Sequence, residues 1–403
     1  MSNRIRLLFS VAACAAFLAS GCSMHEQRAE ASAESAAAAA PARPAKSYDI
    51  ADFIDTVSVS GASFAPDESR LLFSSNRSGI WNAYTMPVGG GEWTAVTQST
   101  TDNVYAIGYF FDDARMLVTR DQGGNELNHV YVIEADGRER DLTPGDKLKA
   151  AFAGFSHAGD AFYLSSNERD PKFFDLYRYD ARTYARELVF RNDAGYELGE
   201  ISDDGRYIAL GKTRTTNDND LHLFDRDSGK VVHLTPHQGD AQFSAQDFAP
   251  DGRFLYYTSN EGSEFARLRR YEFATGTHSD VRSANWDITD VAFSHNGKYR
   301  IDMTNVDGAT VVELFDVASG TPVALPRLPA GEIRNVRISR SEARMAFYVN
   351  GDRQPNDLYV LDFGQAQPVR LTTSLSARID AADLVDSSVV RFKARDGLEI
   401  PNI

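Results

Sequence analysis

The stretch from Phe248 to Ser259 reads FAPDGRFLYYTS: an apolar residue, a polar turn and an apolar strand. This phrase occurs seven times, at intervals of about 46 residues. The other copies are FAPDESRLLFSS from Phe64, YFFDDARMLVTR from Tyr109, FSHAGDAFYLSS from Phe155, ISDDGRYIALGK from Ile201, FSHNGKYRIDMT from Phe293 and ISRSEARMAFYV from Ile338. A repeat of this length is typical of a β-propeller, in which each blade has four short strands.

The segments between the phrases supply the other strands of each blade. A second strand with alternating apolar residues follows every phrase, as in NAYTMPV from Asn82 and HVYVIEA from His129. A third strand often closes in Leu-Thr or Val-Thr, as in RLT from Arg370. With the strand before the phrase, each repeat has four strands, and a four-stranded sheet buries both faces only by stacking against neighbours. The sequence therefore predicts an all-β, seven-bladed propeller over residues 48–385.

The first 22 residues are organised as an export signal. Arg4 and Arg6 precede the apolar run Leu7–Ala19, and small residues lead from this run to Cys22. A basic segment, a short apolar segment and small residues are typical of a cleavable secretory signal. We expect residues 1–21 to be a signal peptide.

The end of this signal, LASGC, resembles a bacterial lipobox, with Ala19 where Leu is usual. The resemblance implies a lipid on Cys22, and Ser23 after it favours the periplasmic side of the outer membrane. The alternative is an ordinary signal followed by an incidental cysteine. The Ala/Pro-rich residues 22–47 read as a disordered linker. No later apolar run approaches bilayer length, so we expect membrane attachment only through the lipid anchor.

Composition limits the partners and the kind of core. The chain has 42 Lys and Arg against 57 Asp and Glu, a net charge of −15, which argues against a nucleic-acid partner. Its two cysteines, Cys14 and Cys22, both precede the predicted propeller, so no disulfide framework holds the repeats together. The fold must depend on its hydrophobic core.

The repeated phrase resembles the "PDGK" motif shared by the Tol-system periplasmic propeller and the prolyl oligopeptidase family of serine peptidases. Two segments favour the peptidases. Arg120–Glu126 (RDQGGNE) resembles a segment of the acylaminoacyl-peptidase and dipeptidyl-peptidase branches, and Val389–Ile403 (VVRFKARDGLEIPNI) resembles the strand that leads into the α/β-hydrolase domain. The resemblance implies a substrate-gating propeller of an exported serine peptidase that cleaves short peptides, of aminopeptidase, dipeptidyl or acylaminoacyl type. The alternative is a self-sufficient Tol-like propeller lipoprotein that binds envelope proteins.

The catalytic machinery of that family has no counterpart in this sequence. The family's serine lies in a G-x-S-x-G turn between a strand and a helix, and the near matches, residues 61–65 and 154–158, belong to the repeats. We expect residues 386–403 to begin a truncated α/β-hydrolase domain that partners the propeller, and this chain alone to be inactive. The resemblance implies that Arg120 and Glu126 contact substrate, because a loop carboxylate can hold the free amino end of a peptide.

Two further clusters invite a metal interpretation. His233 and His237 are separated by Pro236, which rules out the helical pair of a zinc peptidase. The acidic run Asn217–Asp220 lacks the glycine and distal glutamate of a calcium-binding loop, so we expect a solvated loop there. The sequence predicts no metal or cofactor site.

Overall fold

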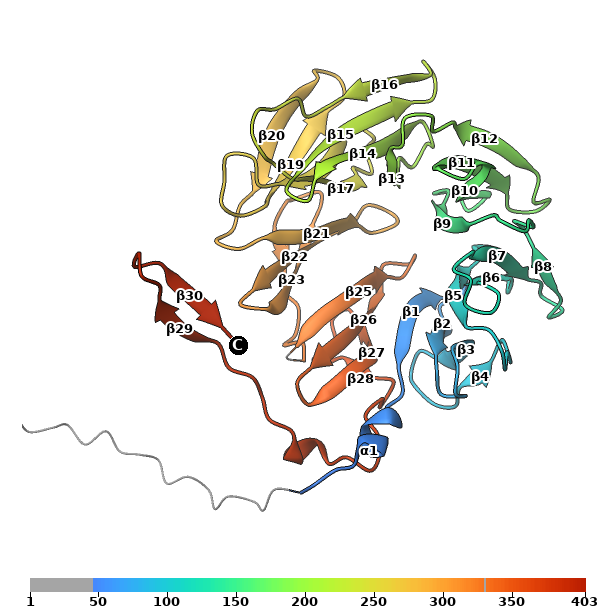
Figure 1. Ribbon diagram of the computed structural model, residues 1–403, viewed down its shortest axis with the longest axis vertical. Coiled ribbons are helices and arrows are strands. Elements are labelled where there is room, and N and C mark those ends of the chain that lie inside the picture. Colours follow the sequence, from blue (N-terminus) through green and yellow to red (C-terminus); the bar gives the residue numbers. More distant parts are fainter. Residues whose placement is uncertain (1–45, 330) are drawn as a thin grey trace, which may run out of the picture. The chain divides into compact units, whose positions relative to one another are not determined.

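The computed structural model describes residues 46–403 except residue 330, and the unit Ser47–Ile403 contains all of its strands. Seven four-stranded antiparallel sheets follow one another along the chain. They stand as blades around a common centre (Figure 1), which confirms the predicted seven-bladed propeller. The helical elements are short: α1 (Ile50–Ile54) and the 3-10 turn η1 (Ala381–Asp383). Within the described residues no helix has the length and apolar character to cross a bilayer.

Each blade takes four consecutive strands, numbered from the centre outward. The bounds are β1 (Val59–Phe64), β2 (Arg70–Ser75), β3 (Asn82–Pro87) and β4 (Thr94–Ala95) in blade 1; β5 (Val104–Tyr109), β6 (Met116–Arg120), β7 (His129–Ile133) and β8 (Glu139–Asp141) in blade 2; β9 (Ala150–Phe155), β10 (Ala161–Asp170), β11 (Phe173–Asp180) and β12 (Arg186–Phe190) in blade 3; β13 (Glu197–Ile201), β14 (Tyr207–Thr215), β15 (Asp218–Asp225) and β16 (Lys230–His233) in blade 4; β17 (Phe243–Phe248), β18 (Phe254–Ser259), β19 (Arg267–Glu272) and β20 (Thr277–Arg282) in blade 5; β21 (Ile288–Phe293), β22 (Tyr299–Val306), β23 (Ala309–Asp316) and β24 (Pro322–Val323) in blade 6; and β25 (Glu332–Ile338), β26 (Arg344–Gly351), β27 (Gln354–Asp362) and β28 (Val369–Arg370) in blade 7.

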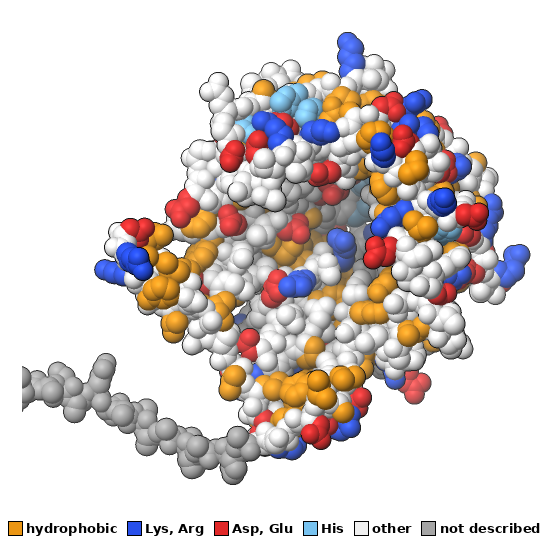
Figure 2. Space-filling view, viewed as in Figure 1, with side chains coloured by type: hydrophobic (Ala, Val, Ile, Leu, Met, Phe, Trp, Pro, Cys, Tyr) orange, Lys and Arg blue, Asp and Glu red, His pale blue; other side chains and the backbone are white. Residues whose placement is uncertain are grey.

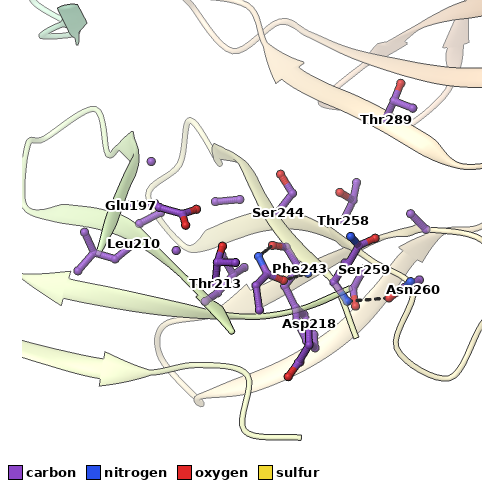
Figure 3. Close-up of a pocket in the computed structure, with 18 of the residues that line it drawn as sticks. Glu197, Leu210, Thr213, Asp218, Phe243, Ser244, Thr258, Ser259, Asn260 and Thr289 are labelled. Carbon is purple, nitrogen blue, oxygen red and sulfur yellow. Dashed lines mark hydrogen bonds between the residues drawn. The ribbon is translucent and has the colours of Figure 1, made fainter. Parts of the chain in front are cut away.

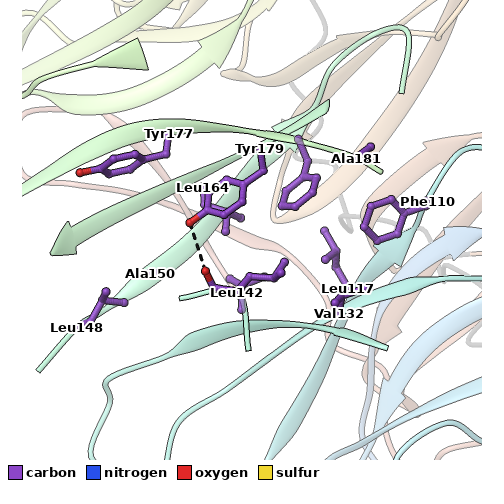
Figure 4. Packing of buried hydrophobic residues seen from close by; sticks show 12 residues of the cluster. Phe110, Leu117, Val132, Leu142, Leu148, Ala150, Leu164, Tyr177, Tyr179 and Ala181 are labelled. Carbon is purple, nitrogen blue, oxygen red and sulfur yellow. Dashed lines mark hydrogen bonds between the residues drawn. The ribbon is translucent and has the colours of Figure 1, made fainter. Parts of the chain in front are cut away.

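The hydrophobic core lies between blades. In the cluster of Figure 4, Leu117 and Val132 of blade 2 pack with Phe162 and Leu164 of blade 3, and all four side chains are fully buried. Each such side chain contributes roughly 1.5–3 kcal/mol through burial. The hydroxyl of buried Tyr179 donates a hydrogen bond to the carbonyl of Leu142 at 3.4 Å, so burial leaves this polar atom paired. Stacking therefore buries the second face that an isolated blade would expose.

The ring closes without exchange of strands, because blade 1 comes wholly from one end of the repeat region and blade 7 from the other. Side chains of both blades share one core cluster, which includes Phe73 and Tyr348. The Tyr348 hydroxyl donates to the Gly61 carbonyl at 2.7 Å, and the Asn356 side chain donates to the Val59 carbonyl at 3.0 Å. Packing and these hydrogen bonds hold the seam.

A β-bulge interrupts the first strand of every blade just before the repeated phrase, for example between Ser60 and Ser63. A bulge frees backbone N–H groups, which need partners when buried. Side chains of the preceding blade accept some N–H groups of the innermost strands: the Ala106 N–H, next to the bulge of β5, donates to Ser74 at 2.8 Å, and the Phe293 N–H, beyond the bulge of β21, donates to the Asp247 carboxylate at 2.7 Å. These hydrogen bonds couple the innermost strand of blade 2 to blade 1, and that of blade 6 to blade 5.

After the last blade the chain forms a hairpin of β29 (Val390–Lys393) and β30 (Glu399–Asn402), which pair only with each other. Arg391 binds both carboxylate oxygens of Asp307 in blade 6 at 2.6 Å. Phe392 and Leu398 are 50% and 62% exposed. The hairpin therefore presents apolar side chains to solvent.

Candidate functional site

The repeat gives the propeller two different faces. The polar turn of each phrase joins the first strand of a blade to the second, so all seven turns lie on one face, called here the turn face. The loops from second to third strands and the links between blades lie on the other, called here the loop face. At the centre of the ring, on the face in view, Figure 2 shows a hollow bordered by acidic and basic side chains.

A polar pocket of about 640 Å³ lies near the loop face, between blades 4, 5 and 6 (Figure 3). Hydroxyl, amide and carboxylate side chains line it together with a few apolar ones. Polar lining residues include Glu197, Thr213, Thr215, Asp218, Asn219, Gln242, Ser244, Thr258, Ser259, Asn260, Asp287 and Thr289. Hydrogen bonds from backbone N–H groups to asparagine side chains fix part of this wall. The Phe243 N–H donates to the Asn219 side chain at 2.7 Å, and the Gln242 N–H donates to the Asn260 side chain at 2.8 Å. Such a lining suits an extended ligand with many hydrogen-bonding groups.

Arg120, one of the two residues expected to contact substrate, ends strand β6 on the loop face. Its guanidinium donates to both carboxylate oxygens of Glu139, at 2.8 and 2.5 Å, and lies 4.1 Å from the centre of the Tyr131 ring. A bidentate, stacked arginine is geometrically fixed. Arg120 therefore braces its own blade.

Glu126, the other expected residue, lies in the next loop and is exposed. Its φ is +59°, a left-handed conformation that is uncommon for any residue other than glycine. The Asp121 carboxylate holds it there by accepting the Glu126 N–H at 2.9 Å. The Gly123 N–H donates to Asp102 at 2.8 Å and ties the loop to the link between blades 1 and 2. Unusual backbone conformations often mark functional residues, and here one presents a carboxylate to solvent.

Three carboxylates lie on the innermost strands of blades 4, 5 and 6: Glu200, Asp247 and Asp290. Burial raises the pKa of all three, that of Asp247 to about 7, and the nearby Glu200 carboxylate adds to the rise at Asp247. Arg337 on β25 opposes the rise at Glu200 and Asp290. Glu200 and Asp290 have exposed side-chain surface, yet protein surrounds the space they face and raises the cost of ionisation.

At the turn face, the third residue of each phrase forms a group called here the mouth residues: Pro66, Phe111, His157, Asp203, Pro250, His295 and Arg340. His157 of blade 3 and His295 of blade 6 stack, with ring centres 4.3 Å apart. Behind them lies a cavity of about 230 Å³ that Glu200 and Asp247 help to line. Sequence reasoning missed this group, although aligning the seven phrases would have shown the unusual third position.

The acidic run Asn217–Asp220 is not the solvated loop expected from the sequence. Asp218 begins strand β15, and both Asp218 and Asp220 are buried. His237 binds Asp218 at 2.9 Å, and His233 binds Asp220 at 2.8 Å. Arg214 also pairs with both carboxylates, at 3.3 Å from Asp218 and 2.6 Å from Asp220, so neither is buried without a partner, which the local sequence did not reveal. Among the described residues no group of three or more His, Cys, Asp or Glu could hold a metal ion.

The remaining predicted positions are Cys22 and the serines of the two near matches to the serine motif. Cys22 lies outside the described residues. Ser63, in one near match to the serine motif, accepts the Tyr109 N–H at 3.1 Å. Ser156, in the other, donates to Asp160 at 2.7 Å. Both hydroxyls serve the packing of the repeats.

No model of a known protein family matches this chain. Dipeptidyl aminopeptidase BIII of Pseudoxanthomonas mexicana is 27% identical over 229 residues, which is 55% of this chain and 33% of that protein. A structure from a study of two prolyl endopeptidases matches with a TM-score of 0.65 at 15% identity, over 87% of this chain and 54% of that one. The structure of prolyl oligopeptidase B from Galerina marginata without substrate gives a TM-score of 0.64 at 14% identity, over 87% and 55%.

The chain thus spans about half the length of the solved proteins it matches, and the aligned part is a third of the curated relative. The structural matches concern the fold, whereas the sequence match to the aminopeptidase indicates common ancestry of the propeller. The protein is therefore a seven-bladed β-propeller that matches the propeller of prolyl oligopeptidases and is homologous to part of a dipeptidyl aminopeptidase.

Proposed function

We propose that this chain is the substrate-gating propeller of an exported serine peptidase that removes residues from the amino end of short peptides. The sequence match to dipeptidyl aminopeptidase BIII carries this proposal. The catalytic serine and its partner residues would lie in an α/β-hydrolase domain that follows residue 403. Residues 386–403 would be the first segment of that domain. The propeller would admit and orient peptides and would not hydrolyse them alone.

Glu126 is the residue we assign to the peptide's amino end. Its loop is tied at two points, through Asp121 and Asp102, so the carboxylate is held on a fixed backbone. A charge-assisted hydrogen bond to an ammonium group is about twice as strong as a neutral one. Arg120 would act indirectly, by keeping β6 and β7 in place below this loop.

Exposed apolar side chains support a further domain on the loop face. Phe392 and Leu398 of the terminal hairpin are at least half exposed, and so are Ile50 and Ile54 of α1. Isolated exposed apolar residues are ordinary, but two such groups on segments flanking the propeller suit a covered surface. We propose that the adjoining domain covers these exposed side chains.

Export and anchoring form part of the same proposal. Lipid on Cys22 would hold the protein at the periplasmic side of the outer membrane, with residues 22–47 as the tether. Labelled palmitate should enter the wild type and not Cys22→Ser. Persistent labelling of that variant, or a wild type that stays soluble in the periplasm, contradicts anchoring at this position.

Calorimetric titration of residues 1–403 with a short peptide tests the role of Glu126. The free-amine peptide should bind about tenfold more tightly than its N-acetylated form, because one charged hydrogen bond is worth about 1.5 kcal/mol. Glu126→Gln should abolish this difference. Glu92→Gln is the matched control, since Glu92 is also an exposed loop glutamate but lies in the outer part of blade 1. Equal binding of both peptides to the wild type contradicts the assignment.

A fluorophosphonate probe tests whether the catalytic serine lies outside residues 1–403. It should label the product of the longer reading frame stoichiometrically and leave residues 1–403 unlabelled, because acyl transfer needs an activated serine beside a base and an oxyanion hole. Labelling of the shorter chain would overturn the proposal. A reading frame without a G-x-S-x-G motif after residue 403 would favour the Tol-like binding module instead.

A further inference from the structure

The contacts among the mouth residues cross the propeller rather than run along its rim. His157 and His295 belong to blades 3 and 6, which are three blades apart in a ring of seven. Their rings are nearly parallel, with 13° between the planes. The His295 ring also meets the Phe111 ring of blade 2 at nearly a right angle, with ring centres 5.7 Å apart. Side chains from opposite blades therefore fill the mouth at the turn face.

Arg340 of blade 7 completes this closure. Its guanidinium lies 4.4 Å from the centre of the Phe111 ring and donates to the Phe111 carbonyl at 2.8 Å. The Arg340 carbonyl accepts a hydrogen bond from Asn296, the residue next to His295, at 2.7 Å. The two histidine rings, the Phe111 ring and the Arg340 cation thus share one contact network.

The charges around the two histidines are unevenly distributed. His157 faces Asp203 at 3.4 Å, whereas His295 lies between His157 and Arg340. Burial lowers the pKa of His295, and both His157 and Arg340 lower it further. The charged and titratable groups facing the pair are Asp203 of blade 4, Glu200 and Asp247 in the cavity behind, and Arg340 and Glu342 of blade 7. The Glu342 carboxylate already accepts hydrogen bonds from the backbone N–H groups of Asn296 and Lys298, in the turn of blade 6.

We propose that the mouth residues form a proton-operated gate, which is closed at neutral pH by the stacked His157 and His295 and opens when these histidines are protonated. In the closed gate, a second proton would place two imidazolium rings against each other and beside Arg340. Separation of the rings removes that repulsion and hydrates both charges. The gate is a property of this propeller and does not depend on the peptidase proposal.

Proton linkage sets the direction of the response. A histidine whose pKa is lower in the closed form than in the open form binds protons preferentially in the open form, so acid favours opening. Each unit of pKa difference changes the ratio of open to closed forms by about tenfold, once the pH is below both values. The ordinary histidine pKa of about 6.5 places the response between neutral and mildly acidic solution.

Distance measurement between spin labels tests the gate directly. Labels on Ala158→Cys in blade 3 and Lys298→Cys in blade 6 report the separation of the two turns, in full chains whose natural Cys14 and Cys22 are serine. Both labelled positions are exposed. The mean distance should lengthen reversibly between about pH 7.5 and about pH 5.5. A distance that does not change with pH overturns the proposal.

Substitutions identify the proton acceptor. His295→Phe keeps an aromatic ring against His157 and cannot take up a proton, so the short distance should persist at both pH values. His222→Phe is the matched control, because His222 stacks on His233 at 4.5 Å within one sheet, away from the mouth, and should leave the lengthening intact. Arg340→Gln should shift the opening to lower pH by removing one cation. Lengthening that survives in His295→Phe, or that disappears in His222→Phe, contradicts the assignment.

Discussion

The turn face and the loop face arise from the same seven repeats, yet their centres differ. At the turn face one residue from each blade reaches the mouth, and the side chains of blades 2, 3, 6 and 7 meet there. At the loop face a polar pocket remains between blades 4, 5 and 6. A repeat therefore fixes where side chains lie, while their size and charge fix whether the space between them is filled.

Replacing a glycine on each face should give the largest difference in stability between the two faces. Gly297 has a φ of +72°, and a Cβ there would lie 2.6 Å from the Cβ of Pro250 in the neighbouring turn. Gly262 on the loop face has a φ of +66° with no atom within 4 Å of such a Cβ. Gly297→Ala should lower the free energy of unfolding by about 3 kcal/mol, from backbone strain plus overpacking. Gly262→Ala should cost about 1 kcal/mol, from strain alone. Urea unfolding of both variants measures the difference, and equal losses would show that the turn face adapts.

Glu342 occupies the position that glycine takes in several other turns, with a φ of +58°. Its buried carboxylate accepts hydrogen bonds from Ser294, Asn296 and Lys298 of blade 6. Glu342→Gly relieves the backbone strain but leaves these donors without their partner. We expect a net loss of about 2 kcal/mol in unfolding free energy. A gain in stability would mean that the strain outweighs the contact between blades.

Asp247, behind the closed mouth, should make stability depend on pH. Its pKa of about 7 lies above that of the unfolded chain, so folding takes up a proton between about pH 4 and 7. Its contribution to stability is full below about pH 4 and falls as the pH rises, by at most about 1.4 kcal/mol per pH unit. Asp247→Asn should remove this slope from unfolding curves measured across the window.

Asp225 serves as a control, because its contribution to the unfolding free energy changes with pH in the opposite direction. Hydrogen bonding to Arg206 lowers its pKa to about 2, so its contribution is present above the unfolded pKa and is lost as the pH falls through about 2. Asp225→Asn should leave the slope between about pH 4 and 7 unchanged. An unchanged slope in Asp247→Asn would place the proton uptake on another group.

The smallest expected effect concerns Glu126, the left-handed glutamate of the loop face. Unlike Glu342, its side chain is exposed. Glu126→Gly should therefore raise the free energy of unfolding, by up to about 1 kcal/mol, because it relieves strain without removing a buried contact. The same variant should lose the preference for free-amine peptides. Greater stability together with weaker peptide binding would identify strain retained for function.

The sequence by itself determined the architecture. Seven phrases with alternating strands predict seven blades, because the pattern of apolar residues along each strand is local and a sheet with two apolar faces must stack. Composition and cysteine positions likewise predicted a fold held by its core. The bulges and the hydrogen bonds between innermost strands and neighbouring blades were not predictable, since they depend on which side chains of another blade lie within reach.

The tertiary structure decided which distant residues meet. The sequence predicted a solvated loop around Asp218 and Asp220, whereas in the folded protein His237 and His233 lie beside them. The sequence also did not show that Arg120, predicted to contact substrate, pairs with Glu139 and stacks on Tyr131. The mouth residues are separated by whole repeats in the chain, and only closure of the ring brings His157 against His295. Pairwise contacts across an axis depend on side-chain geometry in three dimensions, which a one-dimensional period does not encode.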